Sequence, residues 1–399
     1  MLLKDTCNAL CNYYVNNFII DICEEKYDSL LLNEIIDNLK LYNIKSPNKK
    51  DIKSYINDYL KDNYALRCDG NTYIEEKKTK SEISKIEKKV EYLKNVVQPQ
   101  QRTEEWYIFR HNHLTASNLW KVFGSKSSIN QIIYDKCLPI DPNKYKPTFV
   151  ETPMSWGNKY EDVSIMMYEK KYNTKVRDYG CVPHINHEFI AASPDGINDD
   201  KSSPLFGRML EIKNIVNRKI TENPKKDYWI QMQLQMEVCD LDECDFLETR
   251  FIEYESYDDF IKDGTFTRTE KNEQKGLMIY IKDKVNECPL YEYMPIDYNE
   301  SEYKEWENSI LKKYNNENYE WLKNIYWKLD EMSCLLVRRN REWFKEVYPK
   351  LETVWNTIVK ERQDNSYLKR APKKREKNIN TNTIIDFNKK GVNDVLKVI

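Results

Sequence analysis

Two stretches of the chain decide the expected fold: FIAASPDG at residues 189–196 and MLEIKNI at residues 209–215. The first is an apolar run that stops at Pro-Asp-Gly, which predicts a buried strand ending in a turn, with Asp195 at the strand's end. In the second, Glu211 and Lys213 are separated by one residue, so in a strand both project from the same face. An acid and a lysine inside an apolar strand are costly unless they pair with each other or bind a cation. The structural alternatives are an ordinary turn and an internal ion pair.

The two expected strands bring Asp195 and Glu211 close together, with Lys213 beside them. Hard carboxylate oxygens are the ligands that Mg²⁺ prefers. A bound metal polarises a phosphodiester and lowers the pKa of a water molecule, while Lys213 can position that water and neutralise developing negative charge. We therefore interpret Asp195 and Glu211 as metal ligands of a centre that hydrolyses phosphodiesters without a covalent intermediate.

Two flanking segments offer further groups for this site. Glu161 lies in an early turn of a helix expected through residues 163–172, where it could be another metal ligand. The attraction of an acid to a helix N-terminus explains Glu161 equally simply. The segment 228–236 is helical in propensity and carries Gln231 and Gln235 on one face, where an amide could bind water or phosphate. A half-buried strand or a solvated helix face is the alternative for this segment.

Composition indicates a globular protein with no membrane span. Of the 399 residues, 40% are hydrophobic, and no stretch approaches the roughly 20 apolar residues that a bilayer requires. The opening residues 1–5 lack the layout of a signal peptide, so an intracellular location is expected. The formal net charge is only −2, so attraction to DNA must come from local basic clusters such as residues 338–341 and 369–375. The ten scattered cysteines are expected to be reduced and mostly buried.

The pattern along the chain predicts an α/β (α+β) fold with extensions at both ends. A hairpin signal at Asp69-Gly70 follows the first helices, which favours either a winged-helix-like module or a helical cap. The tryptophans after residue 300 are expected on helices, as core rather than as a base-stacking platform. The expected units are a helical module at 1–75, a charged helical connector at 76–99, a core of helices interleaved with strands at 100–290, a helical extension at 291–363 and a basic flexible tail at 364–399.

Five blocks of this sequence, in the same order, resemble the lambda exonuclease-like (YqaJ viral recombinase) family of PD-(D/E)xK nucleases. The resemblance covers roughly residues 100–255. The blocks are QRTEEW at 101–106 continuing to Arg110, TAS at 115–117, WGNKYE at 156–161, SPDG at 193–196 with EIK at 211–213, and the helix that contains Gln231.

The resemblance implies a restriction-endonuclease-like core in which a central mixed sheet is flanked by helices. It implies Asp195, Glu211 and Glu161 as metal ligands, Lys213 as the catalytic lysine, and Gln231 as a supporting catalytic residue. It also implies that Arg110 and Ser117 contact the 5′ phosphate, which is physically sensible because a planar guanidinium grips phosphate oxygens through two hydrogen bonds.

The activity implied by the family is 5′-to-3′ exonuclease digestion of linear duplex DNA with Mg²⁺ or Mn²⁺, in recombination, repair or genome processing. The expected partners are DNA with a free end and a single-strand annealing protein, with no membrane. An oligomer like that of the family is possible, but the extensions at both ends leave its formation undecided. If the protein is viral, the expected location is the host cytoplasm or the virion. The alternatives are a structure-specific endonuclease of the same fold and an inactive DNA-binding scaffold.

Overall fold

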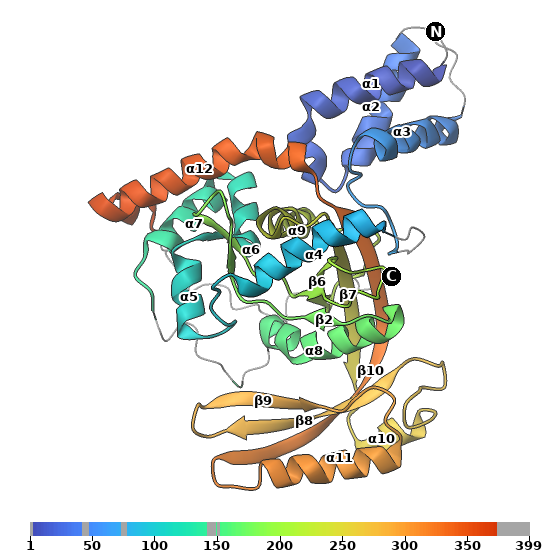
Figure 1. Ribbon diagram of the computed structural model, residues 1–399, viewed down its shortest axis with the longest axis vertical. Coiled ribbons are helices and arrows are strands. Elements are labelled where there is room, and N and C mark those ends of the chain that lie inside the picture. The colour runs from blue at the N-terminus through green and yellow to red at the C-terminus, as the bar shows by residue number, and fades with distance from the viewer. Residues whose placement is uncertain (1–2, 42–47, 73–77, 142–148, 150–151, 373–399) are drawn as a thin grey trace, which may run out of the picture.

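The computed structural model describes residues 3–41, 48–72, 78–141, 149 and 152–372, and Figure 1 shows their arrangement. Three helices form a module at one end, a mixed sheet with covering helices fills the middle, and a smaller α/β module projects at the other end. The expected mixture of helices and strands around a mixed sheet is confirmed. Among the described residues, no helix combines the length and the apolar character that crossing a membrane requires.

A sheet of seven strands is the backbone of the fold, in the order β2-β5-β6-β7-β10-β8-β9. The pair β6–β7 is parallel and every other neighbouring pair is antiparallel. A smaller sheet has the order β1-β4-β3. The strands are β1 (Leu114–Thr115), β2 (Val176–Arg177), β3 (Val182–Pro183), β4 (Ile190–Ala192), β5 (Gly196–Asn198), β6 (Met209–Asn214), β7 (Glu243–Glu253), β8 (Lys275–Asp283), β9 (Cys288–Tyr293) and β10 (Tyr319–Arg338).

The helices cover these sheets and build the module at the N-terminal end. The α-helices are α1 (Leu3–Asn17), α2 (Tyr27–Leu41), α3 (Lys49–Asn63), α4 (Lys80–Asn95), α5 (Glu104–His111), α6 (Ala116–Leu119), α7 (Lys126–Cys137), α8 (Pro153–Tyr172), α9 (Lys226–Cys239), α10 (Tyr257–Lys262), α11 (Glu300–Lys313) and α12 (Arg341–Asp364). Short 3-10 helices are η1 (Ile19–Cys23), η2 (Trp120–Phe123) and η4 (Ser366–Arg370).

The expected N-terminal hairpin is not formed by the described residues. The backbone N–H groups of Asp69 and Thr72 donate to Leu336 and Cys334 of β10, and Leu336 donates back to Gly70. The segment therefore pairs with the long strand instead of with itself, while residues 73–74 of the expected hairpin lie outside the described residues. The helices α1–α3 thus form a helical module, without a hairpin wing in its described part.

The expectation of an entirely helical extension at residues 291–363 is wrong. Residues 319–338 form β10, which runs between β7 and β8 and links the central sheet to the projecting module (Figure 1). Its side-chain alternation is interrupted because the register shifts between Leu329 and Glu331, and again between Trp321 and Lys323. Each shift exchanges the inward and outward positions, so no single period runs through the strand. The sheet of the core therefore extends well past residue 290.

Aromatic side chains make much of the core, as expected, but the helical placement expected for the tryptophans after residue 300 is wrong for Trp321 and Trp327, which lie in β10. Trp343 of α12 packs edge-on against Trp229 of α9, with ring centroids 5.1 Å apart. Tyr160 of α8 stacks on Phe251 of β7 at 4.5 Å. Trp327 is buried beside Gly276, where a Cβ would stand 2.3 Å from the indole ring. All ten cysteines are free, and most are buried.

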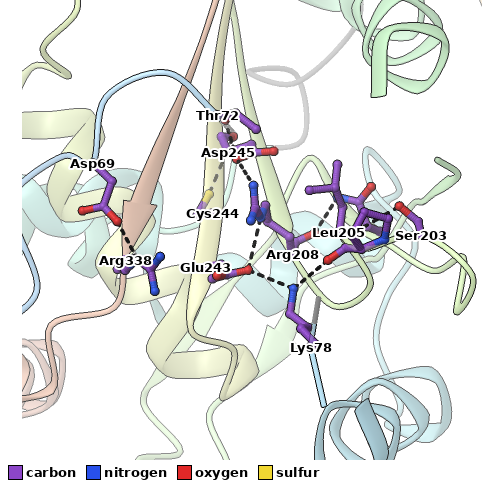
Figure 2. Close-up of polar contacts among 12 residues, drawn as sticks. Asp69, Thr72, Lys78, Ser203, Leu205, Arg208, Glu243, Cys244, Asp245 and Arg338 are labelled. Carbon is purple, nitrogen blue, oxygen red and sulfur yellow. Dashed lines mark hydrogen bonds and ion pairs between the residues drawn. The ribbon is translucent and has the colours of Figure 1, made fainter. Parts of the chain in front are cut away.

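A buried polar network fastens the loop between β5 and β6 to its surroundings (Figure 2). The Arg208 guanidinium donates to Glu243 and to Asp245, both at 3.2 Å, and Asp245 is completely buried. Lys78 donates to the carbonyl of Pro204 at 2.8 Å and reaches Glu243 at 3.2 Å. These bonds hold the hairpin β5–β6 against β7 from the end opposite to the lysine and acid of the EIK motif.

The loop between β5 and β6 also packs against α4. Gly207 has φ +79°, and a Cβ there would lie 2.1 Å from Ile86 Cγ2 of α4. Lys94 of α4 pairs with Asp199 at 2.7 Å. The connector expected at 76–99 is therefore a packed helix whose residues Val90 and Leu93 are buried.

Candidate active site

The hairpin β5–β6 positions the acids and the lysine of the expected centre. Gly196 pairs with Leu210 in the antiparallel register, so Asp195 lies opposite Glu211. Asp195 Oδ2 accepts a hydrogen bond of 2.7 Å from the backbone N–H of Ile212. Lys213 pairs with Glu211 Oε1 and also donates to the carbonyl of Ile212 at 3.1 Å. The alternation of β6 therefore places Glu211 and Lys213 on one face, as expected.

These three groups shift one another's pKa values because they lie close together in a poorly solvated environment. Glu211 is completely buried, whereas Asp195 and Lys213 are partly exposed. Burial raises the pKa of Asp195 well above its usual range, the Glu211 carboxylate adds to the rise and Lys213 opposes it. Burial would lower the pKa of Lys213, but the carboxylates of Glu211 and Asp195 outweigh burial and raise that pKa. Such mutual perturbation is typical of functional sites.

Glu161 joins this group from α8, but not from an early turn. The helix begins at Pro153, after the capping box of Thr152 and Ser155, so Glu161 lies near the middle of a helix of 20 residues. The helix N-terminus therefore no longer explains this acid. Glu161 and Lys213 both influence the pKa of Asp195, which places Glu161 near the hairpin. Its carboxylate accepts a bond of 2.8 Å from Arg102.

The glutamine that touches the acids is Gln235, not Gln231. Gln235 Nε2 donates to Glu211 Oε2 at 2.7 Å and to the carbonyl of Ser193 at 3.2 Å. Gln231 lies one turn earlier on the same face of α9 and is half-buried. In the described part of the protein, Gln235 Oε1 is buried without a hydrogen-bond partner. The sequence predicted the helical face that carries both glutamines, but it could not predict which turn of α9 contacts Glu211.

Arg110 and Ser117 come together on α5 and α6, as expected. Arg110 Nη2 donates to Ser117 Oγ at 2.8 Å, and the guanidinium lies 4.2 Å from the ring centroid of Trp106. Trp106 Nε1 in turn donates to Ser193 Oγ at 3.3 Å, just before Asp195. Trp106 therefore connects Arg110 to the segment that leads into β5.

Lys136 was missed by the sequence reasoning and lies behind Arg110. Its ammonium donates to the carbonyls of Arg110 and, at 2.6 Å, His113. Burial lowers the pKa of Lys136 to about 7, and the nearby guanidiniums of Arg110 and Arg362 add to the decrease. Nothing in the spacing of Lys136 distinguishes it from other helical lysines, so sequence could not have found it.

The donor chemistry of the site fits a divalent cation. Asp195, Glu211 and Glu161 offer hard oxygens, and adjacent buried carboxylates favour capture of a cation. Lys213 and Arg102 already pair with two of these acids. Among the residues that the structure describes, no three His, Cys, Asp or Glu side chains are arranged to hold a metal ion. Binding of one ion by all three acids would therefore require these side chains to move, and the ion would compete with the two ion pairs.

Comparison with known proteins identifies the segment that carries this site. Residues 105–242 match the family model of the YqaJ-like viral recombinase domain. The chain carries a YqaJ-like domain. Its bounds fall within the stretch 100–255 expected from the sequence motifs, and it holds every acid of the site together with Lys213, Arg110 and Ser117. Arg102 lies just before the matched segment.

One viral relative and three solved structures resemble the chain around the YqaJ-like domain. An uncharacterised protein of Acanthamoeba polyphaga mimivirus is 32% identical over 326 residues, which are 72% of this chain, and the chain spans 58% of that relative's length. An alkaline exonuclease of Laribacter hongkongensis is 16% identical, covering 67% of this chain and 97% of its own, with a TM-score of 0.38. The same enzyme in complex with dAMP has a TM-score of 0.36. A phage-related exonuclease of Haemophilus somnus is 13% identical, covering 65% of this chain and 100% of its own, with a TM-score of 0.34.

The basic cluster at residues 338–341 is neutralised within the protein. Arg338 pairs with Asp69, and Arg339 with Glu237 and Asp240. Arg341 pairs with Asp242 at 2.6 Å. These arginines join β10 and α12 to neighbouring elements, which weakens the reading of this cluster as a DNA-binding track.

Proposed function

We propose that this chain is a metal-dependent DNA nuclease that acts as a 5′-to-3′ exonuclease on linear duplex DNA, in viral recombination, repair or genome processing. The observation that carries the proposal is the convergence of Asp195, Glu211 and Lys213 on one hairpin inside a YqaJ-like domain. The viral relative and the word recombinase in the family's description support the biological setting.

Asp195, Glu211 and Glu161 would hold the metal, with Mg²⁺ favoured and Mn²⁺ as the alternative. When bound, such an ion polarises the phosphodiester and makes a water molecule more acidic. Lys213 would orient the attacking water and neutralise charge that develops on the phosphate. Gln235 keeps Glu211 in place through its bond of 2.7 Å. Gln231, one turn away, remains a proposed contact for substrate or water.

Arg110 and Ser117 are the proposed site for a terminal 5′ phosphate. The Arg110 guanidinium donates to the Ser117 hydroxyl at 2.8 Å, so a cation and a hydroxyl lie side by side. A guanidinium binds phosphate oxygens bidentately, which suits the end of a DNA strand. Lys136 fixes the backbone of Arg110 from behind. Recognition of a terminal phosphate would make the enzyme depend on DNA ends.

The proposal is tested with duplexes labelled at either end, with and without a 5′ phosphate, beside a closed circular duplex. With Mg²⁺ we expect release of the 5′ label first, faster degradation of phosphorylated ends and an intact circle. Nicking of the circle would favour a structure-specific endonuclease. Binding of the duplexes with no cleavage under Mg²⁺ or Mn²⁺ would instead indicate an inactive DNA-binding scaffold.

A further inference from the structure

We propose that Arg102 competes with the metal ion for Glu161, so that the resting protein binds divalent cations more weakly than its acids alone would. This inference rests on the proposed function, because it assigns a regulator to the same centre.

The first observation is the contact itself. Arg102 Nη2 donates to Glu161 Oε2 at 2.8 Å and lies 3.4 Å from Asn158 Oδ1, one turn earlier on α8. Glu161 is the one proposed ligand that α8 contributes, and its side chain is 26% exposed. A carboxylate oxygen that accepts from a guanidinium is not free to coordinate a cation. A metal ion that binds Glu161 through both oxygens must therefore displace Arg102, and one that binds through Oε1 alone still meets the positive charge of the guanidinium.

The second observation is the backbone of Arg102. Its φ is +67°, in the left-handed region that favours glycine, and most of the other non-glycine residues there in the described chain are Asn or Asp. Arginine gains nothing from this conformation locally. Backbone strain of this kind persists where the surrounding structure enforces it, and it is concentrated at functional sites. The side chain, rather than the turn, is thus the reason for an arginine at this position.

The neighbours of Arg102 fix the turn and aim the side chain. Gln101 Nε2 donates to the carbonyl of Tyr179 at 3.0 Å and to Asp178 at 3.3 Å, while Thr103 caps α5 by accepting from the Trp106 N–H. Anchored on both sides, the backbone of Arg102 has little freedom to turn away from α8.

The acids around Arg102 place its positive charge where a metal ion would bind. Its guanidinium opposes burial in setting the pKa of Glu161, Asp162 and Asp178, so it faces three carboxylates. Lys213 plays the corresponding part for Glu211. The two cationic side chains thus pair with two of the three acids of the centre before any metal arrives. Lys213 has a role in the proposed chemistry, whereas Arg102 has none besides this pairing.

The test is calorimetric titration of Mn²⁺ into the full chain without DNA. Arg102→Gly suits the positive φ, and Arg102→Gln keeps a polar side chain without the charge, so a folding defect in one leaves the other informative. We expect both to bind Mn²⁺ roughly two- to fivefold more tightly than wild type, which is the worth of a partly exposed ion pair. Arg102→Lys, which keeps the charge, should stay within twofold of wild type.

Two controls separate competition for Glu161 from a general effect of charge. In a Glu161→Gln background, Arg102→Gln should change the Mn²⁺ affinity less than half as much, because the shared oxygen is gone. Arg218→Gln removes a cation that pairs with Glu248 near Lys213 but touches none of the three acids, so it should have a smaller effect.

Unchanged or weaker Mn²⁺ binding by Arg102→Gly and Arg102→Gln would overturn the inference, as would an equal gain in the Glu161→Gln background. If wild type still cleaves DNA with Mn²⁺ in that case, the proposed function stands and only the role of Arg102 fails. Absence of any Mn²⁺ binding by wild type would overturn both.

Discussion

Replacing Gln235 should impair the centre more than replacing Gln231 does, and neither replacement should unfold the protein. We choose leucine for both substitutions because it nearly conserves volume and avoids the cost of a cavity. The two glutamines share one face of α9, but only Gln235 bonds to Glu211. Comparing the two variants therefore tests whether contact with Glu211, rather than position on this helical face alone, decides function.

The magnitude follows from the two ends of the Gln235 amide. Nε2 donates a charge-assisted bond to the Glu211 carboxylate and a second bond to the Ser193 carbonyl, and losing both costs about 2–4 kcal/mol. The buried Oε1 has no partner among the described residues, so removing it returns about 1–3 kcal/mol. The two changes nearly cancel in the free energy of unfolding. The orientation of Glu211 is not restored by that cancellation, and loss of such a supporting contact typically costs roughly 10- to 100-fold in metal affinity or activity.

The assay combines urea unfolding with initial rates on a 5′-phosphorylated duplex in saturating Mg²⁺. We expect Gln235→Leu to unfold within about 1 kcal/mol of wild type and to cleave roughly 10- to 100-fold more slowly. Gln231→Leu should stay close to wild type in stability and should lose less rate than Gln235→Leu, because Gln231 does not contact Glu211. A larger loss of rate for Gln231→Leu than for Gln235→Leu would refute the assignment of Gln235 as the residue that positions Glu211.

Three further predictions concern the terminal phosphate, the buried network and pH. Ser117→Ala and Arg110→Ala should each reduce the preference for phosphorylated over hydroxyl 5′ ends. For Arg110→Ala the reduction should be about tenfold or more, because a charge-assisted bond to the phosphate is lost. An unaltered ratio of the two cleavage rates would contradict the phosphate site. Arg208→Ala should lower the free energy of unfolding by about 3–5 kcal/mol, since the buried Asp245 carboxylate loses its cation. A loss below about 1 kcal/mol in urea unfolding would show that the network does not stabilise the loop between β5 and β6. The pKa of Lys136 is about 7 in the folded protein and near its ordinary value of 10.5 when unfolded, so between these values the unfolded state binds more protons and stability rises with pH. Lys136→Met should therefore gain less stability than wild type between pH 7 and 10, and equal pH slopes in urea unfolding would count against the lowered pKa.

The centre of the hairpin was predictable because strand alternation is short-range. One residue between Glu211 and Lys213 is enough to place them on one face, and the Pro-Asp-Gly turn places Asp195 at a strand end. Burial does not alternate here, because residues 209–212 are all buried, and the contact between Glu211 and Lys213 is what shows the shared face. The acid and lysine could thus be assigned before any packing was known.

Long-range packing decides the parts that were not predictable. Helical periodicity indicated the face of Gln231 and Gln235, but which turn meets Glu211 depends on how far α9 extends over β6. The strand β10 was read as helix because its register shifts interrupt the alternation that identifies strands. The link from Lys136 to Arg110 joins segments 26 residues apart, which no local pattern reports.

The central claim is that the hairpin of Asp195, Glu211 and Lys213 performs hydrolysis. It is tested most directly by the initial rate of Lys213→Met on linear duplex DNA with Mg²⁺, beside Lys219→Met, which removes an exposed lysine of the following loop. We predict at least a roughly 100-fold loss for Lys213→Met, with a folded protein, and little change for Lys219→Met. Full activity of a folded Lys213→Met protein would contradict the claim.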